Sequence, residues 1–123
     1  MAIVLDHTIV PVRDKEASAR FFAEMFGLDG ARPNGRFTAV YVNDALTFDF
    51  DTRATFESHH YAFCITDEEF DAILGRVKAA GRAWGSGPFS AEDGQINTRR
   101  GGRGFYFADL DGHLLEVMTT QER

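Results

Sequence analysis

The hydrophobic positions along this chain change their period several times, and each change marks an expected element. Residues 3–12 are apolar and β-branched, as in a strand, whereas the apolar positions of residues 14–27 recur at helical spacing. Two strand-like runs follow at residues 36–42 and 46–52, with turn residues between them. The first half of the chain therefore predicts a strand, a helix and further strands.

The same order restarts in the second half. Residues 60–66 have the pattern of a buried strand, and residues 67–81 have that of a helix. Residues 102–109 and 113–119 are the remaining strand candidates, and a tight Asp-Gly turn at residues 111–112 is expected to join them. The chain thus reads as two similar halves.

Two pairs of residues set the period of this repeat. His7 and His60 hold equivalent places in the first strand of each half, 53 residues apart, and the expected helix N-caps Asp14 and Asp67 have the same separation. The halves superimpose without a gap over strand and helix. Each is expected to contain a strand, a helix and about three more strands, with residues 52–58 as the link.

Strand periodicity also assigns side chains to faces. One face of each sheet packs on its helix, and the opposite face is left for chemistry. By this alternation His7 and His60 both point away from the helices, whereas His59 has the other parity and is expected at the surface. Cys64 shares the face of His60. We expect a small buried core thiol there, ahead of a nucleophilic or redox role.

Two carboxylates occur on the same faces as the histidines. Glu116 lies in an otherwise apolar strand, where burying an unpaired carboxylate would be costly, so it needs a buried partner. Asp49 is its counterpart in the first half. Two histidines with one or two carboxylates suit Zn, Ni, Co, Mn or Fe and leave positions for water or substrate. A lone strand histidine is more often structural, but equivalent histidines in both halves favour a divalent metal site.

Composition narrows the class of protein. A chain of 123 residues with 44% hydrophobic content suits one domain over residues 1–123. The net charge of −6 argues against nucleic acid or an anionic membrane surface as the main partner. The single cysteine excludes an internal disulfide, and neither a signal peptide nor a membrane span is apparent. A cytoplasmic location is therefore expected.

The polar, glycine-rich segment of residues 85–104 is long for a connection within one domain. It is expected to be partly a strand or a functional lid. Asn97 and Arg99 within it, and Phe105 directly after it, are candidates for contacts with a small-molecule substrate. The alternatives are a solvated polar loop for the first two residues and core packing for Phe105.

Three stretches of the sequence together resemble the vicinal oxygen chelate superfamily, which includes glyoxalase I, bleomycin-resistance proteins, fosfomycin-resistance thiol transferases and extradiol dioxygenases. They are "DHTIVPVRDKEASARFFAEMFGL", "HYAFCITDEEFDAILGRVKAAG" and "GRGFYFADLDGHLLEVMT". The resemblance implies an α+β fold in which two βαβββ modules, about residues 1–52 and 59–123, form an open eight-stranded mixed β barrel. It also implies a homodimer and a divalent metal ion.

The resemblance assigns the metal ligands to His7, His60 and Glu116. The fourth ligand of glyoxalase I would fall on or beside Asp49, which is alternatively a general base. The turn that usually reads Asp-Pro-Asp-Gly is here Asp-Leu-Asp-Gly at residues 109–112, a departure that should matter little.

Two functions from different classes remain open. The first is a metal-dependent enzyme, of the lyase, isomerase, thiol transferase or dioxygenase type, which chelates two adjacent oxygens of a small substrate. The second is a non-catalytic protein of the same fold that sequesters a small molecule or antibiotic. The paired histidines and Glu116 favour the enzyme, because a sequestering groove has no use for metal ligands.

Overall fold

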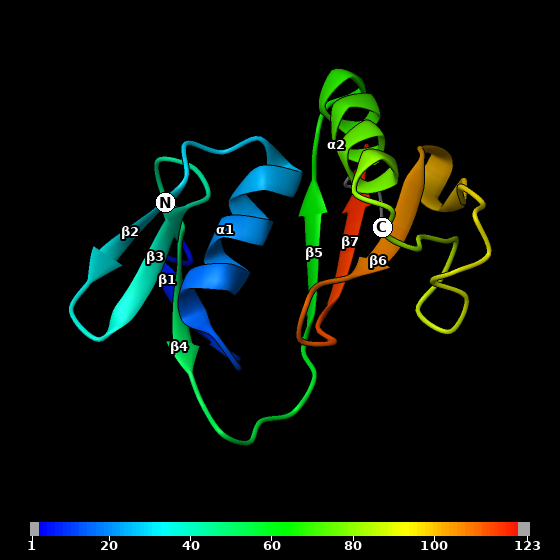
Figure 1. Cartoon of the computed structure of the whole chain (residues 1–123). Coiled ribbons are helices and arrows are strands. Elements are labelled where there is room, and N and C mark those ends of the chain that lie inside the picture. Colours follow the sequence, from blue (N-terminus) through cyan, green and yellow to red (C-terminus); the bar gives the residue numbers. More distant parts are fainter. Residues whose placement is uncertain (1–2, 121–123) are drawn as a thin grey trace. The chain divides into compact units, whose positions relative to one another are not determined.

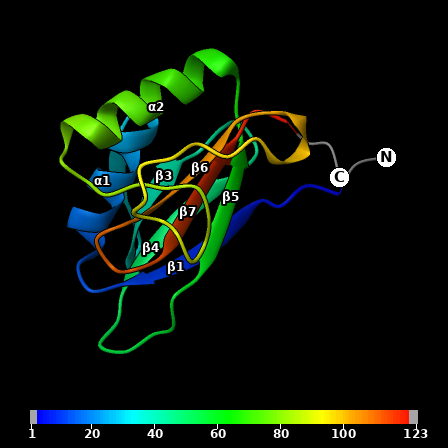
Figure 2. The same cartoon turned by 90° about the vertical axis from the view of Figure 1, so that its right-hand side faces the viewer.

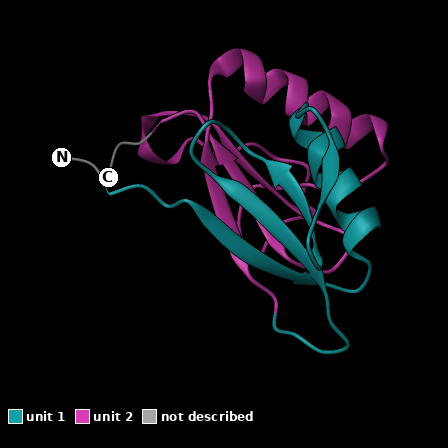
Figure 3. Ribbon diagram, turned by 90° about the vertical axis from the view of Figure 1, so that its left-hand side faces the viewer, with its two compact units in different colours: residues 1–57 teal, residues 58–123 magenta. Residues whose placement is uncertain are grey.

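Both halves of the chain form a strand, a helix and then further strands in the computed structural model, which describes residues 3–120. The chain divides between Glu57 and Ser58 into two units, unit 1 and unit 2 (Figure 3). This boundary lies within the predicted link. Among residues 3–120, every helix is too short or too polar to cross a bilayer.

Unit 1 is a four-stranded sheet with one helix on it (Figure 1). Strand β1 pairs in parallel with β4, whereas β3 pairs antiparallel with both β4 and β2, which gives the order β1-β4-β3-β2. The elements are β1 (His7–Val12), α1 (Lys15–Phe26), β2 (Ala31–Asn34), β3 (Phe37–Tyr41) and β4 (Thr47–Thr52).

The alternation along β4 is as predicted. Phe48 and Phe50 are buried, and their ring centroids lie 5.0 and 5.9 Å from that of Phe22 on α1. Because neighbouring strand residues face opposite sides, Thr47 and Asp49 lie on the face away from α1. This assignment places a predicted site residue on the face left for chemistry.

The ends of α1 are also as predicted. The Asp14 carboxylate accepts hydrogen bonds from the backbone N–H groups of Glu16 and Ala17, as an N-cap should. Gly27 ends the helix at φ 67°, in the left-handed region that favours glycine.

Strand β2 was not located by the sequence. All four of its residues are exposed, so it carries no hydrophobic alternation by which a strand is recognised. A two-residue loop of Gly35 and Arg36 connects it to β3, with Gly35 at φ 59°.

Unit 2 is a three-stranded sheet with α2 along one face (Figure 2). Strand β7 lies in the middle, parallel to β5 and antiparallel to β6. The elements are β5 (His60–Cys64), α2 (Asp67–Ala79), the 3₁₀ turn η1 (Arg99–Gly101), β6 (Gly104–Ala108) and β7 (Leu114–Met118).

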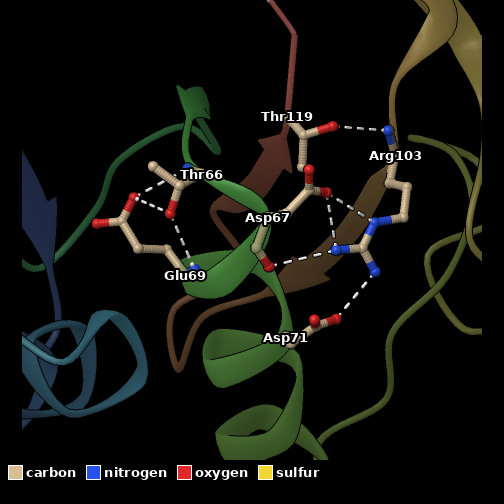
Figure 4. Close-up of polar contacts among 6 residues, drawn as sticks. All are labelled: Thr66, Asp67, Glu69, Asp71, Arg103 and Thr119. Carbon is tan, nitrogen blue, oxygen red and sulfur yellow. Dashed lines mark hydrogen bonds and ion pairs between the residues drawn. The ribbon is translucent and has the colours of Figure 1, made fainter.

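The N-cap of α2 is Thr66, so the prediction of Asp67 as cap is wrong. The Thr66 hydroxyl accepts from the backbone N–H of Glu69, and the Glu69 carboxylate accepts from the backbone N–H of Thr66 (Figure 4). This reciprocal pair outcompetes a cap at the next residue. The cap consequently lies six residues after His60 in unit 2, whereas Asp14 lies seven residues after His7 in unit 1.

The segment of residues 85–104 replaces the fourth strand of unit 2. It runs along the free edge of β6 with isolated antiparallel pairs, Gly85 with Tyr106 and Asn97 with Gly104. Residues 3–120 therefore contain seven strands, where eight were expected. The composition of this segment explains the missing strand. Pro88 has no N–H to donate to a strand ladder, and the many glycines of residues 85–104 have no side chains to pack on the sheet.

The β6–β7 connection is longer than predicted. Ala108 pairs with Leu114, so residues 109–113 all lie in the loop instead of a tight turn at 111–112. The buried Asp109 carboxylate organises this loop by accepting from the backbone N–H groups of Asp111 and His113. The change in loop length sets which residues face each other across β6 and β7.

Candidate functional site

His60 and Glu116 come together on the face of the unit 2 sheet opposite α2. Because Ala62 is the cross-strand partner of Glu116, His60 and Glu116 share a face of the parallel β5–β7 pair. His60 Nε2 lies 2.9 Å from Glu116 Oε1. The His60 side chain is 45% exposed and that of Glu116 15%. Glu116 thus has a partner as predicted, but the partner is exposed instead of buried.

Tyr106 joins this pair from the third strand. It is the direct cross-strand partner of Glu116, and its ring centroid lies 5.7 Å from that of His60. Burial raises the pKa of the Tyr106 hydroxyl, and the charge and hydrogen-bond acceptance of the Glu116 carboxylate raise it further. The hydroxyl thus stays protonated near neutral pH and serves as a donor.

Arg99 reaches the same tyrosine from the 3₁₀ turn. Its Nη1 lies 3.3 Å from the Tyr106 hydroxyl oxygen, and its guanidinium carbon lies 5.9 Å from the centroid of that ring. Its Nη2 donates to the backbone carbonyl of Ser86 at 2.9 Å. This contact places a predicted substrate-binding residue one side chain away from Glu116.

The other two residues predicted to contact substrate, Asn97 and Phe105, instead make contacts within the protein. Asn97 donates through Nδ2 to the carbonyl of Ser86 and accepts the backbone N–H of Arg99, so its polar groups hold the segment together. Phe105 is fully buried between Phe70 and Trp84 on the helix side of the sheet. The expectation that Phe105 contacts substrate is wrong, because β6 turns it away from the face of Glu116.

In unit 1, His7 is oriented by its neighbour in sequence. Its Nδ1–H donates to the Asp6 carboxylate at 2.8 Å, which leaves Nε2 for a ligand. The hydrogen bond that His7 donates to Asp6 is the main reason that the pKa of His7 is raised, and the charge of Asp49 adds to it. A carboxylate behind an imidazole is the arrangement that commonly supports metal-binding histidines.

His7 and Asp49 line one open cavity of about 530 Å³ on unit 1. Asp49 is buried and accepts from Asn34 Nδ2 at 3.0 Å. Arg36, also at this cavity, is tied to the buried Asp51, which accepts from Arg53 as well. These guanidinium contacts, with Arg53 the larger cause, lower the pKa of Asp51 despite its burial.

Two further predictions concern the neighbours of His60. His59 is exposed as expected, and its backbone N–H donates to Nδ1 of the fully buried His113. Cys64 is exposed, so the expectation of a buried core thiol is wrong. Its parity puts it on the same face as His60, and that face is not the core of unit 2.

Comparison with protein-family models assigns this chain to a family. The model of the glyoxalase/bleomycin resistance protein/dioxygenase superfamily matches residues 4–117. The chain belongs to this superfamily. The resemblance seen in the sequence motifs is thereby confirmed, together with the superfamily fold.

Several members of the superfamily are similar to this chain over nearly all of its length. The solved structure of oxidase ChaP-H1 is 42% identical, covers 97% of each chain and has a TM-score of 0.92. That of oxidase ChaP-H2 is 40% identical, covers 99% of this chain and 97% of its own, and has a TM-score of 0.91. The glutathione transferase FosA of Serratia marcescens is 28% identical over 92% of this chain and 78% of its own.

The donor set in this superfamily member suits a divalent ion. Imidazole nitrogen and carboxylate oxygen, as in His60 and Glu116, are donors that such ions accept. Among residues 3–120, no three His, Cys, Asp or Glu side chains come together in a group of this kind.

Sequence reasoning missed Tyr106 and Asp6 as parts of these clusters. Asp6 stands directly before His7, so a carboxylate beside a candidate ligand was a usable signal. Tyr106 offered none, because the expected tight turn places it opposite Val117, whereas the five-residue loop places it opposite Glu116.

Proposed function

We propose that this protein is a metal-dependent oxidase that binds two adjacent oxygens of a small organic substrate. The His60–Glu116 pair carries the proposal, because it supplies two ligands of the expected type on an accessible face of unit 2. The similarity of about 40% to two proteins named as oxidases supports this reaction class.

The metal would be held by His7, His60 and Glu116. A divalent ion with open positions supplies Lewis acidity toward the chelated oxygens of the substrate. Asp6 holds the His7 ring by Nδ1 and so presents Nε2. Asp49, which lines the cavity beside His7, would be a fourth ligand or the base that takes a proton from the substrate.

The same proposal extends to the architecture. Residues 1–123 form one domain in which the two modules build the open barrel of the superfamily, with the segment of residues 85–104 in the place of the eighth strand. The pairs of Gly85 and Asn97 with β6 support that placement.

We further propose a homodimer and a cytoplasmic location. Light scattering should give twice the mass of 13.7 kDa, and a monomer would contradict the dimer.

A thiol transferase is the second candidate, supported by the 28% identity to glutathione transferase FosA. It would use the same ligands but activate an electrophilic carbon for attack by a thiol. A non-catalytic sequestering protein is a weaker alternative, because it does not require the His60–Glu116 pair.

Metal analysis of the wild type beside His60→Ala tests the proposal. We expect about one divalent ion per wild-type chain and a large loss in the variant. Equal, negligible metal in both would reject the metalloenzyme. With the metal-loaded protein, oxygen uptake in the presence of ortho-oxygenated aromatic compounds supports the oxidase, whereas loss of glutathione thiol with an epoxide supports the transferase.

A further inference from the structure

We propose that Arg99 is a positioning residue, which acts through Tyr106 to orient the carboxylate of Glu116. The inference rests on the proposed metal-binding function of Glu116. It assigns the segment of residues 85–104 a part in building the site, in addition to any contact with substrate.

The direction of the hydrogen bonds follows from the chemistry of the three groups. Arginine is only a donor, so the Tyr106 oxygen must accept from Nη1 of Arg99. The single hydroxyl proton of Tyr106 is then free to point toward Glu116, its cross-strand partner, which as a carboxylate can only accept. His60 Nε2 contacts Oε1 of Glu116, and the Tyr106 hydroxyl is the second group positioned to orient this carboxylate.

The backbone around Arg99 is shaped to hold the guanidinium at Tyr106. Gly85 pairs with Tyr106 through both backbone hydrogen bonds, of 2.9 and 2.8 Å. The carbonyl of the next residue, Ser86, accepts both from Arg99 Nη2 and from Asn97 Nδ2. The segment is thus anchored on the same residue that its arginine contacts.

Close packing excludes a side chain at one point of this anchor and crowds a second point. A Cβ at Gly85 would lie 2.0 Å from the backbone oxygen of Ser90, and one at Gly104 would lie 2.9 Å from Oδ1 of Asn97. The tight approach at Gly85 and Gly104 leaves little freedom for the backbone that carries Arg99. Preorganisation of a ligand by such outer groups is commonly worth 10- to 100-fold in metal affinity.

Co²⁺ affinity of the 123-residue chain, measured by competition with a chromophoric chelator, tests the inference. Tyr106→Phe is expected to weaken Co²⁺ binding by about 10- to 100-fold, and Arg99→Gln by about tenfold. Arg100→Gln is the matched control, because Arg100 is directed at the sulfur of Met118 instead. It should bind Co²⁺ as the wild type does.

The double variant separates positioning from a general effect on folding. If Arg99 acts through Tyr106, then Arg99→Gln costs little further affinity in the Tyr106→Phe background, and the visible spectrum of bound Co²⁺ changes in the same way in both single variants. Additive losses, or wild-type affinity in Arg99→Gln, would overturn the inference while His60→Ala still loses metal. A wild type that binds no Co²⁺ would overturn both the inference and the proposed function.

Discussion

Two glycines, Gly75 and Gly85, lie in opposite structural environments. Gly75 is exposed within α2, and a Cβ added there has open space around it. Gly85 is buried at the edge of β6, where a Cβ would meet the Ser90 carbonyl. The first glycine costs helix stability, whereas the second is required by a close approach of two backbones.

Alanine should therefore have opposite effects at these two positions. Gly75→Ala is expected to raise the free energy of unfolding by about 0.5–1 kcal/mol, because glycine is entropically costly inside a helix. Gly85→Ala is expected to lower it by about 1–3 kcal/mol through overpacking. Urea unfolding of both variants measures this, and a stable Gly85→Ala protein would mean that the segment can move away from β6.

From the sequence, a residue could be assigned to the site only where strand alternation alone determines the face on which its side chain lies. His60 and Glu116 could be assigned to one face because alternation needs no knowledge of the partner strand. Tyr106 could not, since its partner depends on the length of the loop organised by Asp109. Phe105 was a candidate as an aromatic residue that could line a groove, and its burial against Phe70 supports the alternative of core packing.

At the scale of elements, the N-terminus of α2 is fixed from two sides (Figure 4). Thr66 and Glu69 form the capping box, and Arg103, directly before β6, binds the carboxylates of Asp67 and Asp71 at 2.9 Å each. Both carboxylates are largely exposed, so these ion pairs contribute modestly to stability. The cap is therefore the stronger of the two attachments.

Thr66→Ala should lower the free energy of unfolding by about 0.5–2 kcal/mol, because it leaves orphan N–H groups at the start of α2. Thr66→Ser keeps the acceptor oxygen and should retain most of the stability. Thermal unfolding of the two variants beside Asp67→Asn checks this. A larger loss in Asp67→Asn than in Thr66→Ala would restore Asp67 as the dominant residue at this end.

The β6–β7 loop should give the protein a pH-dependent stability. Burial raises the pKa of Asp109 above its ordinary value of 3.8, even though backbone N–H groups of Asp111 and His113 favour the charged form. A carboxyl whose folded pKa is raised is stabilising while protonated, and that contribution is lost as the pH rises through the folded pKa.

Asp109→Asn removes this titration but keeps an acceptor oxygen for the loop. Relative to the variant, the wild type should be less stable at pH 7 than at pH 4, as measured by urea unfolding at both values. Asp44→Asn, in an exposed turn, is the matched control substitution. A pH-independent difference between wild type and Asp109→Asn would contradict the raised pKa.

Helices and strands were predicted correctly where buried and exposed side chains alternate with a recognisable period, and were missed where they do not. Both helices and the strands β1, β3, β4, β5, β6 and β7 carry hydrophobic periodicity, and all were found near their predicted positions. Strand β2 has only exposed residues, and its pairing with β3 is specified by the Gly35 hairpin. Backbone pairing of this kind leaves little trace in hydropathy.

At the scale of the whole molecule, the proposed metal ligands come from both units. His7 belongs to unit 1, and His60 and Glu116 to unit 2. If these three residues bind one ion, metal binding is linked to the folding of both halves of the chain. The prediction rests on the 53-residue repeat, which places one histidine in each half.

Bound metal should therefore stabilise the intact chain through residues of both units. At a free Zn²⁺ concentration 100 times the Kd, the expected gain in the free energy of unfolding is about 2.7 kcal/mol. His7→Ala and His60→Ala should each abolish most of this gain. Thermal unfolding with and without Zn²⁺ measures it, and an undiminished gain in His7→Ala would place the metal on unit 2 alone.

The hydrophilic edge strand β2 has a consequence for solubility. It is the last strand of its sheet, and all of its residues are exposed. An open strand edge can template pairing with another chain, which is a common start of aggregation. Pro33 removes an N–H from this edge and Arg32 adds a charge, two features that discourage such pairing. The strand that hydropathy failed to reveal is thus well suited to remain without a partner chain at high protein concentration.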